Sequence, residues 1–272
     1  MIEAKYKNIH RSVKFGDNVS IKCEKVTIGK FSRIGNNVKI QCKELEIGEH
    51  LFMADGVEIG RGGCTGSRSN VRIGNGVGIF ENTVINPLEP VEIGDNCGIG
   101  GDVMIWTHGA WLDTTQGFPA DFGPVKIGDN VWLPARSIVL PNVTIGNDVV
   151  IGINSIINRS LPDGCFAAGS PCKVIKENVY PKKLNYEELN KLVWEIIYDW
   201  TELIRYKGEW EFTVEYKKNS DEIFFNYKNQ DTIYNIIDKT MKGAVNPVSE
   251  DFRDYLRRRG IKIYTDRFFK SI

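Results

Sequence analysis

A six-residue repeat runs through the first part of the chain and constrains its fold more than any other feature. From Val125 to Ser160 the units follow without a gap as VKIGDN, VWLPAR, SIVLPN, VTIGND, VVIGIN and SIINRS. The third residue of each unit is almost always aliphatic. A unit of this length holds one short strand and one turn, and three units close one coil. The repeat therefore predicts a mainly β chain of stacked coils.

The aliphatic third positions are predicted to point into the axis of the coils, each stacked on its counterpart. They are Ile28, Ile34, Ile40, Ile47, Met53, Ile59, Ile73, Ile79, Ile85, Ile93, Ile99, Ile105, Ile127, Leu133, Val139, Ile145, Ile151 and Ile157. β-Branched residues suit a buried pleated strand, and Gly and Asn suit corners with positive φ. Coils that bury their apolar side against neighbours form a solenoid. An ordinary antiparallel β protein is the alternative, which the constant spacing disfavours.

Two interruptions of the repeat are predicted to be loops, and loops of a solenoid carry its specific functions. The first, residues 60–70, is rich in Gly and Ser and is expected to be exposed with Arg61 and Arg68. The second, residues 109–124, leaves the repeat directly after His108. Long insertions are usually functional or disordered, and the aromatic residues of the second one favour order. These are Trp111, Phe118 and Phe122.

The chain changes character after the repeat ends. Apolar residues recur at helical spacing over residues 185–207, and alternating strands are expected at 209–216 and 222–228. A short helix with Ser249 as N-cap is predicted over 249–260, then a strand over 261–269. The run Arg257–Arg259 is interpreted as a solvated helix end. We expect a β-solenoid domain at 1–180 and a small α+β domain at 181–272.

Composition narrows the class of protein. Lys plus Arg and Asp plus Glu are both 35, so no overall field favours nucleic acid. No signal peptide and no transmembrane segment is expected, since no apolar run approaches about 18 residues. No cysteine forms a C-x-x-C pair, so reduced thiols in a cytoplasmic protein are predicted. The cysteines are Cys23, Cys42, Cys64, Cys97, Cys165 and Cys172.

The stretch VKIGDNVWLPARSIVLPNVTIGNDVVIGINSIINRSLPDGCFAAGSPCKVIKE, residues 125–177, resembles the hexapeptide-repeat acetyltransferases. The resemblance covers about residues 70–177 and, more loosely, the chain from residue 20. It is nearest to the galactoside, maltose and polysaccharide O-acetyltransferases. It implies a left-handed parallel β-helix, a homotrimer with clefts between subunits, and acetyl-CoA as co-substrate. Nothing comparable is recognised in the last ninety or so residues.

The resemblance also implies roles for individual residues. The family's catalytic histidine precedes an inserted loop, and Ile105-Trp106-Thr107-His108 matches that position. Acetyl-CoA contacts are implied along the last coils, and acceptor contacts in the coil before the histidine. The implied cofactor residues are Trp132, Ala135, Ile153, Asn158, Arg159, Lys173 and Lys176, and the implied acceptor residues are Asn82, Asn86 and Glu89. The chain departs from the family at Pro134, usually Gly, and at Ile153, usually Ala or Gly.

The chemistry of acetyl transfer suits a histidine. A thioester is already activated, whereas a hydroxyl needs a base, and imidazole titrates near neutrality. We expect His108 to take the acceptor proton in a direct transfer that needs no metal. A backbone N–H near Asn142 or Ala135 is expected to hold the oxyanion. Glu89 and Asp113 are the candidates to orient the imidazole, Asp113 also as an acceptor contact.

Several functions remain open at this stage. A sugar hydroxyl, on a cell-surface polysaccharide or its precursor, is the favoured acceptor, followed by the amine of an aminosugar nucleotide and by an antibiotic. A γ-type carbonic anhydrase would need three zinc-binding histidines. His10, His50 and His108 have spacings that do not correspond to coil multiples, which disfavours such a site. His10 and His50 are interpreted as structural or exposed residues. A non-catalytic sugar-binding or scaffold solenoid would leave His108 unexplained.

Overall fold

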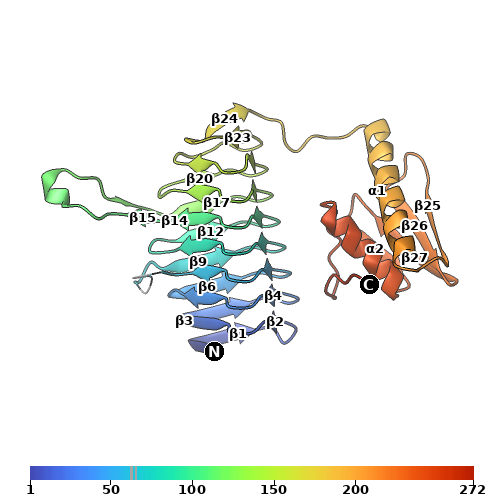
Figure 1. Ribbon diagram of the computed structural model, residues 1–272, viewed down its shortest axis with the longest axis horizontal. Helices are drawn as coiled ribbons and strands as arrows, with labels where there is room; N and C mark the ends of the chain where they lie inside the picture. The colour runs from blue at the N-terminus through green and yellow to red at the C-terminus, as the bar shows by residue number, and fades with distance from the viewer. Residues whose placement is uncertain (62–63, 65) are drawn as a thin grey trace. The chain divides into compact units, whose positions relative to one another are not determined.

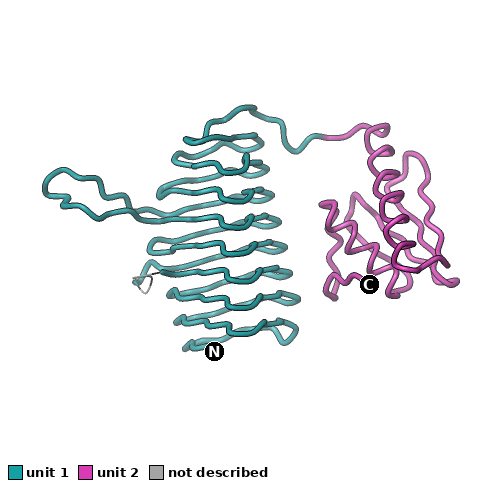
Figure 2. Tube along the Cα trace, in the orientation of Figure 1, with its two compact units in different colours: residues 1–182 teal, residues 183–272 magenta. Residues whose placement is uncertain are grey.

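The chain divides into two compact units, Met1–Lys182 and Lys183–Ile272 (Figure 2). The computed structural model describes residues 1–61, 64 and 66–272. Unit 1 is the solenoid, whose coils stack from the N-terminus upward in Figure 1. Unit 2 is a small α+β fold. The predicted order of a mainly β solenoid followed by an α+β segment is confirmed.

Three faces of short parallel strands build the solenoid. The first face contains β6 (Glu44–Ile47), β9 (Asn70–Ile73), β12 (Val91–Ile93), β17 (Val125–Ile127) and β20 (Thr144–Ile145). The second contains β2 (Lys14–Phe15), β4 (Arg33–Ile34), β7 (Phe52–Met53), β10 (Gly78–Ile79), β13 (Gly98–Ile99), β18 (Trp132–Leu133), β21 (Val150–Ile151), β23 (Phe166–Ala168) and the antiparallel β24 (Lys173–Lys176). The third contains β5 (Lys39–Gln41), β8 (Glu58–Ile59), β11 (Val84–Asn86), β14 (Met104–Trp106), β19 (Ile138–Val139) and β22 (Ile156–Ile157).

The first coils are joined by longer strands. β3 (Ser20–Ile28) pairs with β5 through its first half and with β6 through its second half, so it turns a corner between the third and first faces. β1 (Ile2–Ile9) runs parallel to β3 along the same course. These strands close the N-terminal end of the stack.

The predicted rungs form the core. Every third-position residue named from the sequence is buried, and the register places Ile127 on Ile93 and Val139 on Ile105. The first position of many units is buried as well, as at Val91 and Val125. Each coil therefore removes apolar side chains from water only by stacking, at a gain of about 25 cal/mol per Å².

The corners explain the I-G-D-N motif more fully than the sequence did. Asn96 and Asn130 have φ near +57° and +56°, as expected for corner residues. The glycine has another role, because Gly94 lacks positive φ but approaches the next coil closely. A Cβ there would lie 2.7 Å from the carbonyl carbon of Gly128 and closer still to Asp129 Oδ1. That carboxylate accepts the Asp95 backbone N–H at 2.7 Å, and the pattern repeats up the stack.

We expect Gly94→Ala to destabilise the solenoid by about 1–3 kcal/mol, the cost of overpacking a site that cannot expand. Chemical denaturation of the purified chain measures this change in the free energy of unfolding. Gly109→Ala is the matched control, because nothing lies within 4 Å of a Cβ there. Equal stability of the two variants would contradict the close-approach explanation.

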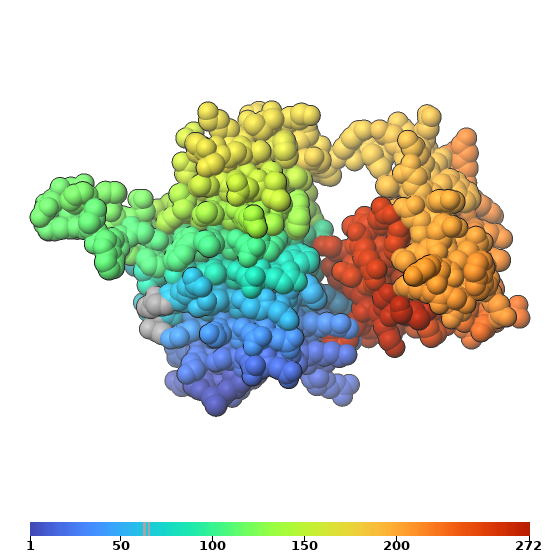
Figure 3. All heavy atoms as spheres, viewed as in Figure 1, coloured from blue at the N-terminus to red at the C-terminus, as the bar shows by residue number. Residues whose placement is uncertain are grey.

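An arm interrupts the solenoid within the predicted insertion. β15 (His108–Gly109) pairs antiparallel with β16 (Asp121–Phe122), and η1 (Thr114–Gln116) forms the tip. Figure 3 shows this hairpin as a projection from the coils. The insertion is thus ordered, as its aromatic residues predicted.

Unit 2 packs two helices and a sheet around Trp200, which is fully buried. Its elements are α1 (Tyr186–Tyr206), β25 (Phe212–Tyr216), β26 (Glu222–Tyr227), β27 (Gln230–Asn235), β28 (Thr240–Gly243) and α2 (Pro247–Arg258). The predicted long helix and the first two strands are confirmed. Asn185 begins α1 in a capping box with Glu188. The sequence did not reveal β27 and β28.

Two predictions for the C-terminal segment were wrong. Helix α2 begins at Asn246 rather than Ser249, because Asn246 Oδ1 accepts the Ser249 backbone N–H at 2.8 Å and Pro247 occupies the first turn. Residues 261–269 form no strand. The buried Arg253 side chain donates to the carbonyls of Ile263 at 3.0 Å and Phe268 at 2.6 Å. In a β-strand, these carbonyls would accept from the backbone N–H groups of a neighbouring strand.

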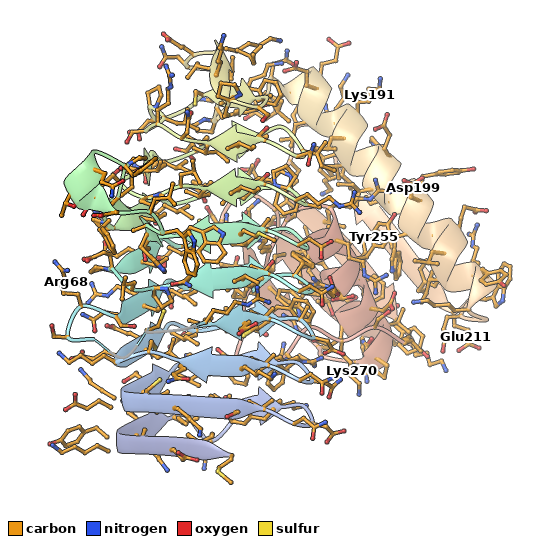
Figure 4. The ribbon with its side chains drawn as sticks, turned by 60° about the vertical axis from the view of Figure 1, so that its left-hand side comes forward. Arg68, Lys191, Asp199, Glu211, Tyr255 and Lys270 are labelled. Carbon is orange, nitrogen blue, oxygen red and sulfur yellow. The ribbon has the colours of Figure 1, made fainter. Side chains whose placement is uncertain are left out.

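The run Arg257–Arg259 is tied to neighbouring acids. Arg257 and Arg258 both bind Asp254, and Arg259 binds Asp199 on α1 and Tyr255 on α2. Asp199 and Tyr255 are labelled in Figure 4. In the part of the chain that the structure describes, none of the helices has the length and apolar character that crossing a bilayer requires.

Candidate active site

His108 lies where β14 leaves the third face and the arm begins. Its imidazole stacks on Phe122 of the returning strand, with ring centroids 6.1 Å apart and planes 18° apart. The Trp106 ring meets it edge-on at 6.2 Å. Because Ile105 is fully buried in the core, the chain enters this aromatic clamp from a rigid rung. The ring of His108 is therefore fixed by the solenoid and the arm together.

Thr107 anchors both ends of the arm. Its hydroxyl donates to the Asn86 carbonyl at 2.7 Å and accepts the Glu89 backbone N–H at 3.0 Å. Its own carbonyl accepts the Gly123 N–H at 3.0 Å. All of Thr107 is buried, so these bonds are shielded from water. This role of Thr107 could not be predicted from the sequence, because its partners come from another coil.

The Nδ1 atom of His108 is buried and finds no hydrogen-bond partner among the described residues. The two carboxylates expected to orient the ring are engaged elsewhere. Glu89 accepts an ion pair from Arg68 at 2.6 Å, and Asp113 caps the arm tip through the N–H and hydroxyl of Thr115. Neither Glu89 nor Asp113 therefore accepts a hydrogen bond from the His108 imidazole in this chain.

Asn86 and Glu89 are both buried, and the backbone of each bonds to the hydroxyl of Thr107, the residue before His108. The Asn86 side chain accepts from the Cys64 thiol at 3.1 Å and donates to the Arg61 carbonyl at 3.0 Å. The predicted loop 60–70 thus folds back onto this coil, with Cys64 and Ser69 buried and Arg68 exposed at the edge of the solenoid (Figure 4). Its residues 62, 63 and 65 lie outside the described part of the chain.

Asn82 occupies a different corner from His108. It precedes β11, whereas His108 follows the equivalent strand one coil above. Its φ is +57° and its side-chain amide contacts Asp102 at 3.4 Å. These are the properties of a corner residue, so the structure of one chain does not bring Asn82 to the imidazole.

The residues implied for the cofactor lie on the coils from His108 upward. The Trp132 ring lies over Gly98, where an added Cβ would be 2.6 Å from a ring carbon. Ala135 and Ile153 occupy successive coils at the next corner, linked by the Asn154 N–H to the Ala135 carbonyl at 3.1 Å. Ile153 points outward and is 70% exposed.

The polar residues of this set lie higher. Asn158 and Arg159 are exposed and follow Ile157, which lies two coils, or about 10 Å, above Ile105. Lys173 and Lys176 are exposed on β24, which closes the second face. Three cations at the top of the stack suit the phosphates of a nucleotide.

The remaining histidines are structural in this chain. His10 exchanges a hydrogen bond with Ser12 at 2.8 Å, and His50 stacks on Phe31 at a corner of the coil. Both are as the sequence suggested. The candidate site thus contains one imidazole, an aromatic arm and a row of cofactor candidates above it.

These features define a class of protein: a solenoid of six-residue units that carries a histidine where an inserted arm begins. Residues 124–159 match the family of the bacterial transferase hexapeptide (six repeats). Over these residues the solenoid carries the repeat of this family, and the curated relatives that the chain matches are named as acetyltransferases. The resemblance inferred from the sequence is confirmed.

Individual relatives show how far the likeness extends. The chain is 36% identical over 112 residues to galactoside O-acetyltransferase of Escherichia coli strain K12, covering 40% of this chain and 55% of the relative. It is 34% identical over 129 residues to a putative lipopolysaccharide biosynthesis O-acetyl transferase of the same strain, covering 41% and 66%. A solved galactoside acetyltransferase in complex with coenzyme A matches at 28% identity and TM-score 0.43, covering 52% and 70%. The chain spans about half the length of the curated relatives it matches first.

Proposed function

We propose that the chain is an acetyl-CoA-dependent O-acetyltransferase that acts on a sugar hydroxyl in the biosynthesis of a cell-surface polysaccharide. The observation that carries the proposal is the placement of His108, clamped at the root of an aromatic arm and below the cofactor candidates. The family of the solenoid and the names of its relatives support acetyl transfer and the sugar acceptor.

In this proposal His108 acts as a general base. Its imidazole takes the proton of the acceptor hydroxyl as that oxygen attacks the acetyl carbonyl. The imidazolium then gives this proton to the CoA thiolate, which leaves as the free thiol. Phe122 stacks on the ring and Thr107 fixes the backbone just before it, so little reorganisation is needed during the reaction. A backbone N–H near Asn142 or Ala135 stabilises the oxyanion. Acetyl-CoA supplies the activated thioester, and no step requires a metal.

Residues of the upper coils hold the nucleotide end of acetyl-CoA. Arg159, Lys173 and Lys176 are exposed cations that match its phosphates, and Trp132 offers an apolar surface to the pantetheine. The exposed Ile153 side chain narrows the proposed acetyl-CoA groove at this corner. A neighbouring subunit supplies the second wall of this groove, so we expect a homotrimer. Sedimentation velocity measures the oligomer, and an active monomer would contradict it.

The proposal is tested with purified chain, acetyl-CoA and a panel of glycans and aminosugars, following release of free thiol. Acetylation of a sugar hydroxyl, located by mass spectrometry and NMR, is the expected result. Transfer only to amines of aminosugar nucleotides would replace the O-acetyl proposal with the N-acetyl one. Failure to bind acetyl-CoA in a titration would leave a sugar-binding or scaffold solenoid.

The arm is expected to bind the acceptor. Trp111 is 95% exposed, and Phe118 is exposed on the same hairpin, as sugar-stacking rings need to be. We expect the double variant Trp111→Ala and Phe118→Ala to raise the KM for the acceptor by about 5- to 10-fold through lost ring contacts. The KM for acetyl-CoA should stay unchanged in the same steady-state assay.

Trp210→Ala in unit 2 is the matched control, since it removes another exposed tryptophan without touching the arm. It should leave both KM values unchanged. An equal rise of both KM values in the arm variant would count against a role in acceptor binding.

A further inference from the structure

Two cysteines lie in contact at the N-terminal end of the solenoid. The Sγ atoms of Cys23 and Cys42 are 3.6 Å apart, and the residues are separated by one coil of 19 positions. Lys22 pairs with Gln41 in the parallel register, so each cysteine is the next residue on its strand course. The two thiols therefore face each other at the corner between the third and first faces. The sequence showed no C-x-x-C pair and gave no reason to join them.

The two thiols differ in their surroundings. Cys42 is buried and Cys23 is half-buried. Both line a surface hollow that also contains charged side chains of both signs, Lys5, Lys22, Lys43, Glu3 and Glu24. A hydrogen bond from Cys42 lowers the pKa of the Cys23 thiol, and the same contact with burial raises the pKa of the Cys42 thiol. Cys23 is thus the more exposed and the more acidic of the two thiols. This is the asymmetry of an attacking and a resolving cysteine.

We propose that Cys23 and Cys42 are an oxidation site, at which a hydroperoxide joins the two sulfurs into a disulfide that staples the first coils. Cys23 thiolate attacks the peroxide oxygen and becomes a sulfenic acid, with water or an alcohol as the leaving product. Cys42 sulfur then attacks the Cys23 sulfur, forming the S–S bond. The Cys23 hydroxyl leaves with the Cys42 proton as water. Two thiols lose two electrons and two protons to one peroxide.

The general spacing of neighbouring strands is compatible with a disulfide. Adjacent parallel strands lie about 4.8 Å apart, which is within the Cα separation of about 4.4–6.8 Å found for disulfides. The sulfurs must close from 3.6 Å to about 2.05 Å. Side-chain rotation alone can supply that change, since the two strands are held by the ladder of β3 and β5.

The other four thiols are either held less acidic by burial or bound to another acceptor. Cys64 donates to Asn86 Oδ1 at 3.1 Å, and burial raises its pKa to about 11. Burial likewise raises the pKa of Cys165 and Cys172. Cys97 is buried and bound to the Gly128 carbonyl at 3.0 Å. Oxidation should therefore be selective for the Cys23–Cys42 pair.

The test treats the full chain, reduced and freed of reductant, with one equivalent of hydrogen peroxide. We expect titratable thiols to fall from six to four, with an intact mass lower by two hydrogen atoms and a peptide linking Cys23 to Cys42. Dithiothreitol should restore six thiols. The melting temperature of the oxidised chain should rise by about 5 °C, because the unfolded chain is constrained.

Three variants sharpen the test. Cys42→Ser should stop at a sulfenic acid on Cys23 that dimedone traps, Cys23→Ser should yield neither product, and Cys97→Ser should behave as the unaltered chain. Unaltered chain that keeps six thiols, or that links Cys64, Cys97, Cys165 or Cys172 instead, would overturn the proposal. This readout on the unaltered chain stands even if a serine variant fails to fold.

Discussion

Replacing His108 with alanine is expected to lower kcat for acetyl transfer by about a hundred- to ten-thousand-fold. The imidazole is the candidate base among the described residues of this corner, where the Trp106 ring and Phe122 of the arm both contact it. Removing it leaves the acceptor hydroxyl to attack without help. The dissociation constant of acetyl-CoA should stay unchanged, because other residues are proposed to bind acetyl-CoA. Steady-state kinetics and a binding titration measure the two quantities separately.

His10→Ala is the matched control for this variant. His10 is exposed and its ring bonds only to Ser12, by both the Ser12 hydroxyl and its N–H. It should keep normal turnover in the same assay. Near-normal turnover of His108→Ala would remove the proposed base. A lost acetyl-CoA affinity would instead assign the ring to cofactor binding or to the shape of the groove.

The solenoid could be predicted from the sequence because its rule is local. Within each uninterrupted run an inward position recurs every six residues, so the rungs from Ile28 to Ile157 follow from the repeat once its breaks are located. The glycine of the motif could not be assigned correctly by the same rule. Gly94 is required because Asp129 of the following coil approaches it, and that coil lies beyond the whole arm. The thiol contact of Cys23 with Cys42 was hidden likewise by a coil of 19 residues rather than 18.

The candidate site was predictable only in part. His108 could be found because an insertion follows it, and the insertion forms the arm. Its surroundings could not, since Thr107 reaches Asn86 and Glu89 across a coil whose register the sequence left open. Glu89 looked like a partner for the imidazole until Arg68 was found to bind it. Ion pairs between distant segments leave no periodic signal.

Unit 2 shows the same limit, and Arg253 provides its clearest test. This guanidinium is completely buried, although the sequence places it in an ordinary amphipathic helix. It binds Glu250 and the carbonyls of Ile263 and Phe268, and it lies over the Phe269 ring at 4.4 Å. Side-chain contacts, those of Arg253 foremost, therefore hold the C-terminal segment in place of a β-ladder.

We expect Arg253→Leu to destabilise unit 2 by about 3–5 kcal/mol. Two carbonyls would lose their donor in a dry interior, and Glu250 would keep only its pair with Arg267 at 3.2 Å. Denaturant titration followed by peptide-resolved hydrogen exchange measures the loss in unit 2 apart from the solenoid. Residues 261–269 should lose protection first, because their attachment is removed directly.

Arg258→Leu is the matched control on the same helix. Arg258 pairs with Asp254 but its side chain is 44% exposed, and a screened pair of this kind contributes at most about 1 kcal/mol. If the two variants lost equal stability, burial would not be the reason that Arg253 matters. If Arg253→Leu left the free energy of unfolding unchanged, packing by leucine would replace the buried ion pair without cost, as happens for some buried ion pairs. A large loss confined to the Arg253 variant is expected, because the carbonyls of Ile263 and Phe268 both accept from this one buried guanidinium.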